Sequence, residues 1–275
     1  MGLSGLLVSL PLAALVVSAV VTACSHRAAM RGSAAECPER DDGARSLPAR
    51  CRLLATECGA LWLLLLAAPF GIRTRPGGTA EGDASMPVLL VPDPGFPAAS
   101  LRWLGRRLRR DGWPSVHVVT GGGRRSGHGV AAVAAAIARV RGDTGARGVA
   151  VVAHGAGGLV TRALLLGGAG DAGIARLVTL GTPHHGTCVP WAPPELRPGS
   201  ALVSRLASEA TTTEAIDCVS IYSLDDGFAA PPDRGYWPGA LNIEIRDVGH
   251  ASLVLSRRVY ELVREQLAAP LRCPS

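Results

Sequence analysis

A short stretch near the middle of the chain constrains the fold more than any other. Val149 to Ala153 is a continuous apolar run, which predicts a buried β-strand. A turn of mostly small residues follows, and Leu159 to Leu166 has the pattern of a helix. A strand, a tight turn and a helix in this order form the frame of a nucleophile elbow, the motif Gly-x-Ser-x-Gly.

The central position of this motif lacks its nucleophile. Residues 153–157 have the sequence Ala-His-Gly-Ala-Gly, so Gly155 stands where the serine is expected. The elbow strains the backbone of its central residue, and glycine adopts a positive φ without steric cost, so we expect the turn to keep its shape. No Ser or Cys between residues 149 and 160 restores the motif in another frame. By itself the stretch also fits a glycine-rich turn of another α/β protein.

Three later segments separate these alternatives. Residues 177–187 are Leu-Val-Thr-Leu-Gly-Thr-Pro-His-His-Gly-Thr, residues 221–227 are Ile-Tyr-Ser-Leu-Asp-Asp-Gly, and residues 248–253 are Val-Gly-His-Ala-Ser-Leu. They resemble, in this order, the strand and loop after the elbow, the acid loop and the histidine loop of bacterial triacylglycerol lipases of the α/β-hydrolase family. The resemblance covers roughly Pro87 to Leu271 and keeps the family's order of nucleophile, acid and histidine. It implies hydrolysis of carboxylic esters through an acyl-enzyme.

The resemblance also implies roles for two side chains. His250 matches the catalytic base, and Asp226, which precedes Gly227, matches the acid that orients it. Asp225 is the competing acid. Without the resemblance, His250 is an ordinary surface residue and the two aspartates are ordinary turn carboxylates.

The expected oxyanion hole departs from the family pattern. One donor is the backbone N–H of Ala156, the residue after the nucleophile position. The second should come from the loop after the first strand of the domain, which commonly begins His-Gly in the family. Here residues 92–96 are Pro-Asp-Pro-Gly-Phe, so Asp93 would oppose a developing oxyanion and the two prolines remove backbone donors.

Strands alternate with helices along the domain at 87–271. This order predicts a mostly parallel central sheet with helices on both faces. The resemblance implies that this sheet is that of the α/β-hydrolase fold. The expected strands are 88–91, 115–120, 149–153, 175–181, 216–222 and 241–245, and the expected helices are 98–111, 130–141, 159–166 and 252–269. Residues 183–215 are the expected lid-like insertion, which contains Trp191 and an amphipathic run from Leu202 to Ala210.

One or two transmembrane helices are expected before the domain. Residues 1–24 begin with an uncharged apolar run that is long enough to span a bilayer. It is either a retained membrane helix or a signal segment, because Val-Thr-Ala before Cys24 resembles a lipoprotein cleavage site. Residues 25–52 form an expected loop. Residues 53–72 are a second expected span, with Glu57 at the interface, and the alternative is an interfacial or domain-packing helix. Residues 73–86 are an expected linker.

The arginines of the 25–52 loop place that loop in the cytoplasm of a bacterial cell. We therefore expect the hydrolase domain outside the cytoplasmic membrane, or, in the alternative, a secreted lipoprotein anchored through Cys24. In that compartment Cys188 and Cys218 could form a disulfide; unpaired buried cysteines are the alternative.

The net charge of +6 does not predict a nucleic-acid partner. All basic residues are Arg, and the densest run, 106–110, fits the solvated face of a helix. The neighbouring His184 and His185 raise the alternative of a metal site, but the family carries this pair as a structural element. We expect no metal and no other cofactor, and the sequence identifies no protein partner.

These features predict a membrane-anchored, lipase-like protein that is catalytically impaired and keeps a site for a lipid or ester ligand. The alternative is an active ester hydrolase in which His250 and Asp226 activate water, or which uses an unidentified nucleophile. A purely structural membrane protein is the third class, and it gives no reason for the two residues to be present.

Overall fold

The domain is built on a parallel β-sheet. The computed structural model describes residues 47–67, 86–113, 115–119, 126–167, 172–208 and 216–272. In these ranges six strands pair in the order β2-β1-β3-β4-β5-β6, and every pairing is parallel. The prediction of a mostly parallel central sheet is therefore confirmed. The strands are β1 (Val88–Val91), β2 (Val116–Val118), β3 (Val149–His154), β4 (Ile174–Leu180), β5 (Asp217–Ser223) and β6 (Leu241–Ile245).

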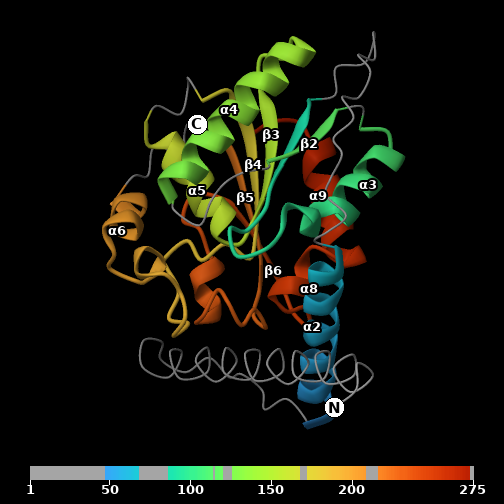
Figure 1. Ribbon diagram of the computed structural model, residues 1–275, viewed down its shortest axis with the longest axis vertical. Coiled ribbons are helices and arrows are strands. Elements are labelled where there is room, and N and C mark those ends of the chain that lie inside the picture. The colour runs from blue at the N-terminus through green and yellow to red at the C-terminus, as the bar shows by residue number, and fades with distance from the viewer. Residues whose placement is uncertain are drawn as a thin grey trace, which may run out of the picture.

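Helices cover both faces of this sheet (Figure 1). On one face, α4 (Ser126–Thr144) and α5 (Ala156–Leu165) pack against the strands. On the other lie α3 (Arg102–Arg110), α8 (His250–Leu253), α9 (Arg257–Ala268) and the N-terminal α2 (Leu47–Ala67). Leu90 of β1 belongs to the second core and its neighbour Leu89 to the first, because successive strand side chains point to opposite faces. The remaining described elements are η1 (Ala98–Leu101), η2 (Pro194–Leu196), α6 (Ala201–Ser208) and η3 (Pro232–Gly235).

Two expected helices are each divided in the structure. The helix expected at 98–111 is a 3-10 turn, η1, followed by α3. The helix expected at 252–269 is α8 and then α9, which begins after a new N-cap where the Ser256 hydroxyl accepts a hydrogen bond from the backbone N–H of Val259. Apolar spacing continued across both joints, so the pattern alone did not reveal the break. The α8 turn carries His250 as its first residue.

One side of the segment expected as a second membrane span packs on the domain. Its described part belongs to α2, which begins at Leu47, inside the expected loop. No helix within the described ranges is long and apolar enough to cross a membrane. Leu53 and Leu64 are buried in α2, and Figure 1 shows α2 alongside α8. The alternative of a domain-packing helix therefore fits this segment, whereas residues 1–46 and 68–85, including the first expected span and the linker, lie outside the described residues.

Glu57 explains why this helix is anchored to the domain. Its carboxylate is buried, and it accepts hydrogen bonds from the backbone N–H of Ala251, the backbone N–H of Ser252 at 3.1 Å and the Ser252 hydroxyl at 2.7 Å. The first backbone N–H groups of a helix have no partner within the helix. Glu57 therefore caps α8, the turn that presents His250.

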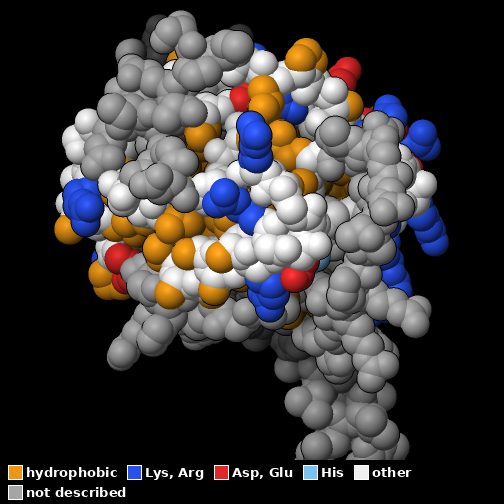
Figure 2. All heavy atoms as spheres, turned by 90° about the horizontal axis from the view of Figure 1, so that it is seen from above, with side chains coloured by type: hydrophobic (Ala, Val, Ile, Leu, Met, Phe, Trp, Pro, Cys, Tyr) orange, Lys and Arg blue, Asp and Glu red, His pale blue; other side chains and the backbone are white. Residues whose placement is uncertain are grey.

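Two further expectations concern the surface. No disulfide joins Cys188, which is exposed, to Cys218, which is buried. On α3, Arg106 and Arg110 are exposed while Leu108 is buried, as expected for a solvated helix face. Figure 2 shows basic side chains scattered over one face of the molecule, separated by apolar and neutral ones. The positive charge on this face is therefore not gathered in a continuous stripe.

Candidate functional site

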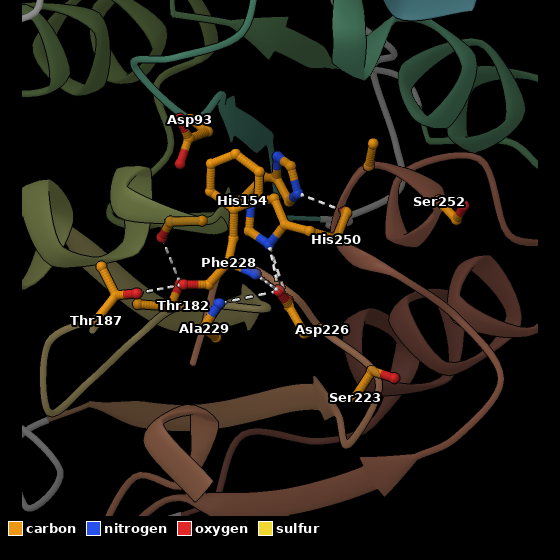
Figure 3. A network of polar contacts seen from close by, with 12 residues as sticks. Asp93, His154, Thr182, Thr187, Ser223, Asp226, Phe228, Ala229, His250 and Ser252 are labelled. Atoms are coloured by element: carbon orange, nitrogen blue, oxygen red, sulfur yellow. Dashed lines mark hydrogen bonds and ion pairs between the residues drawn. The ribbon is translucent and has the colours of Figure 1, made fainter. Parts of the chain in front are cut away.

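A buried histidine–aspartate pair lies at the carboxyl edge of the sheet. Asp226 is on the loop after β5, and His250 begins α8 after β6. The His250 Nδ1 atom lies 2.8 Å from Oδ2 and 3.0 Å from Oδ1 of Asp226 (Figure 3). Oδ1 also accepts hydrogen bonds from the backbone N–H groups of Phe228 at 2.7 Å and Ala229 at 2.9 Å. Asp225, the competing acid, instead accepts one from the backbone N–H of Asp247 at 2.6 Å.

The pair is charged at neutral pH. Burial by itself lowers the pKa of His250, but the Asp226 carboxylate outweighs this effect and, with Asp93 and Glu57, raises the pKa to about 9. Burial by itself raises the pKa of Asp226, but the charge and hydrogen bond of His250 hold it below its ordinary value of 3.8. At neutral pH the imidazole therefore carries a proton on both nitrogens and cannot accept another.

Gly155 occupies the turn between β3 and α5. Its φ is 53° and its ψ is −132°, a conformation that strains any residue with a Cβ. Its N–H donates to the carbonyl of Leu180 at 2.9 Å, and its own carbonyl accepts from the Thr182 hydroxyl at 2.8 Å. The strained turn is thus held by β4 and by the loop that follows it.

The Asp93 carboxylate fills the place where a serine side chain would be. A Cβ built on Gly155 would lie 2.1 Å from Oδ2 of Asp93 and 2.9 Å from Nε2 of His250. The carboxylate is held there by the backbone N–H of Ala156, which donates to Oδ2 at 2.7 Å, and by that of Gly95, which donates to Oδ1 at 2.6 Å. The expected oxyanion donor, Ala156, therefore already binds an anion that belongs to the protein.

The Nε2 atom of His250 has no hydrogen-bond partner among the described residues, although it is buried. In a serine hydrolase this nitrogen faces the nucleophile. Here it faces the slot beside Gly155, where the Asp93 carboxylate lies instead. An imidazolium N–H without an acceptor is costly to bury, so a water molecule or a ligand atom that accepts its hydrogen bond is favoured at this position.

A cavity of about 290 Å³ adjoins this slot. Most of its lining is apolar. Leu159 and Val160 come from α5, Trp191 and Leu202 from the insertion at 183–215, and Phe228 from the acid loop. Asp93 and His250 are among the few polar side chains in the lining. The described part of the insertion thus covers an apolar cavity at the site, while residues 209–215 lie outside the described ranges.

His154 is a site residue that we did not predict. Its ring lies 4.5 Å from that of His250, and its Nε2–H donates to the His250 backbone carbonyl at 3.1 Å. Burial, together with the charge of His250, lowers its pKa to about 4, so it stays neutral beside the imidazolium. Its position just before Gly155 in the elbow was the available signal. Glu57 was missed for another reason: a charged residue within an apolar run was interpreted as an interfacial anchor.

Of the paired histidines, His184 has a structural role. His184 is buried, its Nε2 lies 3.1 Å from the Thr179 hydroxyl, and its ring stacks on Trp237 at 4.5 Å. Arg162 of α5 donates to its Nδ1 at 3.1 Å and to the carbonyl of Leu206 in α6. This network ties the insertion to α5. Within the described residues, no group of three potential metal-ligating side chains occurs.

Comparison with known proteins extends only to the fold. No profile of a known protein family matches the chain, and no curated protein sequence does. Among solved structures, the mature lipase BlEst2 of Bacillus licheniformis superposes with a TM-score of 0.60 at 15% identity, covering 71% of this chain and 100% of the lipase. Aspergillus fumigatus lipase B gives 0.59 at 17% identity, covering 72% of this chain and 55% of that enzyme.

The protein has the fold of these lipases. A lin2722 gene product of Listeria innocua shares it as well, with a TM-score of 0.52 at 14% identity, covering 68% of this chain and 95% of that protein. At such low identities the likeness concerns the α/β-hydrolase fold and not the reaction. What the site can do must be argued from its own side chains.

Proposed function

We propose that this protein is a non-hydrolysing member of the lipase-like α/β-hydrolase fold that binds an apolar ligand in the cavity beside His250. One observation carries the proposal: the Asp93 carboxylate lies within the slot of the missing nucleophile and accepts a hydrogen bond from the Ala156 N–H at 2.7 Å. Acyl transfer needs that slot for a nucleophile and that N–H for the oxyanion. Both are occupied by the same side chain.

The loss of the nucleophile and the loss of the oxyanion donor each lower the rate of hydrolysis by a large factor. Removing the nucleophile of a serine hydrolase costs roughly 10⁶-fold in turnover, because the triad acts as a unit. A negative charge in the oxyanion hole adds to this, since it repels the charge that develops on the substrate oxygen. The apolar cavity needs neither a nucleophile nor a free oxyanion donor, so ligand binding is the function that the geometry supports.

Direct activation of water by His250 is the second candidate. The unpartnered Nε2 atom favours it, because a water molecule placed there would be in reach of the imidazole. The charge state opposes it at neutral pH, since a pKa of about 9 leaves the imidazole protonated. Residual hydrolysis by this route would rise as the pH is raised through about 9 and would disappear in His250→Ala.

The test uses the purified chain with a fluorophosphonate probe and with p-nitrophenyl butyrate. We expect no covalent labelling and no turnover above that of His250→Ala between pH 6 and 8. An active serine hydrolase in the same buffer is the positive control for both reagents. Labelling of the wild-type chain, or turnover that depends on His250 in this pH range, would show that the protein is an enzyme.

A further inference from the structure

We infer that the cavity selects an uncharged amphiphile, whose head group both donates and accepts a hydrogen bond, as an aliphatic alcohol or primary amide does. The inference rests on the proposed function, because it concerns a ligand that is bound and not hydrolysed. It follows from two polar atoms of opposite character that face one small space. These are Nε2 of His250 and Oδ2 of Asp93, which lie 2.9 Å and 2.1 Å from the Cβ position of Gly155.

The two atoms require opposite partners. The Nε2–H of His250 is buried, and it has no acceptor among the residues that the structure describes. Oδ2 of Asp93 accepts one hydrogen bond, from Ala156, and a carboxylate oxygen has room for a second. A hydroxyl oxygen between them accepts from the imidazolium and donates to the carboxylate. A primary amide does the same with its carbonyl and its NH₂ group.

The charges of the site exclude both kinds of ionic head group. A carboxylate head would be attracted by the His250 imidazolium but would face the Asp93 carboxylate, with the buried Asp226 behind the ring. An ammonium head would be attracted by Asp93 but would face the imidazolium, which has no spare acceptor. In a cavity with a mostly apolar lining, like charges are screened less than in water, so each ion leaves one unfavourable contact.

The rest of the ligand is apolar. Leu159, Val160, Val189, Leu196 and Phe228 line the cavity of about 290 Å³, which provides room for a short alkyl chain. Each buried methylene group of such a chain strengthens binding about fourfold. The aromatic ring of Phe228 stacks on the imidazole at 4.8 Å and shields it from solvent. The tail therefore supplies the affinity and the pair of polar atoms supplies the selectivity.

The test compares four ligands that share one tail: 1-octanol, octanamide, octanoate and octylammonium. Each is titrated calorimetrically into the full-length chain at pH 7. We expect the alcohol and the amide to bind at least tenfold more tightly than either ion. In Asp93→Asn the repulsion of an anion is removed, so octanoate should gain at least tenfold relative to 1-octanol, whereas octylammonium should gain nothing.

The matched control is Glu261→Gln. Glu261 is exposed on α9, where it pairs with Arg257 at 2.8 Å, and it does not line the cavity. This variant changes the net charge by the same amount and should leave all four affinities as in the wild type. Equal binding of octanoate and 1-octanol by the wild type, an unchanged ratio in Asp93→Asn, or no measurable binding of 1-octanol would each overturn the inference.

Failure of this inference is distinguishable from failure of the proposed function. If the fluorophosphonate does not label the chain and the four ligands bind equally well, only the head-group selectivity is contradicted. A chain that reacts with the probe contradicts the proposed function, whatever its preference. Circular dichroism of each variant before titration verifies that a change in affinity does not come from unfolding.

Discussion

Restoring a serine at position 155 is expected to fail unless Asp93 is removed first. In Gly155→Ser the new Cβ would lie 2.1 Å from Oδ2 of Asp93, far inside van der Waals contact, so the carboxylate must leave. It then loses the hydrogen bonds from the backbone N–H groups of Ala156 at 2.7 Å and Gly95 at 2.6 Å. In Asp93→Ala the slot is already empty, and the serine meets no such obstacle.

The magnitudes follow from these contacts. A hydrogen bond to a charged group contributes about 1.5–3 kcal/mol to stability, and two are lost when the serine displaces the carboxylate. A residue with a Cβ at the φ of 53° found at Gly155 adds strain of about 1–3 kcal/mol in either background. We therefore expect Gly155→Ser to cost at least about 3 kcal/mol less in the Asp93→Ala background than in the wild type, a favourable coupling between neighbouring sites.

The assay is a double-mutant cycle in urea, followed by circular dichroism, with fluorophosphonate labelling of the same four chains. Only the double variant should be labelled, because it alone combines a hydroxyl, a free Ala156 N–H and the His250–Asp226 pair. Its labelling should increase as the pH is raised towards about 9, because His250 must lose a proton before it can act as the base. Gly145→Ser is the matched control: Gly145 also has a positive φ, 69°, but a Cβ there meets nothing within 4 Å. Its cost should be the same with and without Asp93.

Equal costs of Gly155→Ser in the two backgrounds would refute this reasoning, because they would mean that the carboxylate does not occupy the slot. Labelling of Gly155→Ser alone would refute it as well. A labelled double variant with no coupling in stability would show that Asp93 blocks the chemistry through its charge and not through its position.

Further predictions concern the charged groups around the histidine. Because the folded state raises the pKa of His250 from 6.5 to about 9, the stability that it contributes, about 3 kcal/mol, is fully present below pH 6.5 and is lost as the pH rises through about 9. In Asp226→Asn the free energy of unfolding, measured in urea across this pH range, should no longer fall as the pH rises. A fall that persists in this variant would contradict the assignment. Glu57→Ala removes three hydrogen bonds to α8 and should cost about 3 kcal/mol, whereas the exposed Glu261→Ala should cost less than about 1 kcal/mol; similar costs would show that Glu57 does not cap α8.

The hydropathy of α2 fits two interpretations for a physical reason. A helix that packs on a large domain through one face and carries apolar residues on the other has a mean hydropathy close to that of a membrane span. Leu63 and Leu66 are exposed while Leu64 is buried, so the run is apolar on both sides. The residue that separates the two interpretations is Glu57, and its partners lie 194 and 195 positions away in the chain.

The sequence by itself determined the features that depend on near neighbours. Apolar runs of β-branched and aliphatic residues specified the strands, small residues specified the turn at Gly155, and the chain order placed Asp226 and His250 on successive loops at the carboxyl edge of a parallel sheet. The strands and the turn depend on the local conformational preference of a few residues, which a pattern can reveal, whereas Asp226 and His250 were assigned through the family resemblance.

Only the tertiary structure decided what occupies the site. The Asp93 carboxylate reaches the Ala156 N–H across 63 positions of the chain because β1 and β3 are neighbours in the sheet, which brings the loops that follow them together. The composition of residues 92–96 predicted a charge near the oxyanion hole. It did not predict that the Asp93 side chain would accept a hydrogen bond from the oxyanion donor itself. A hydrogen bond of this kind depends on the packing of the whole sheet, and no local pattern encodes that distance.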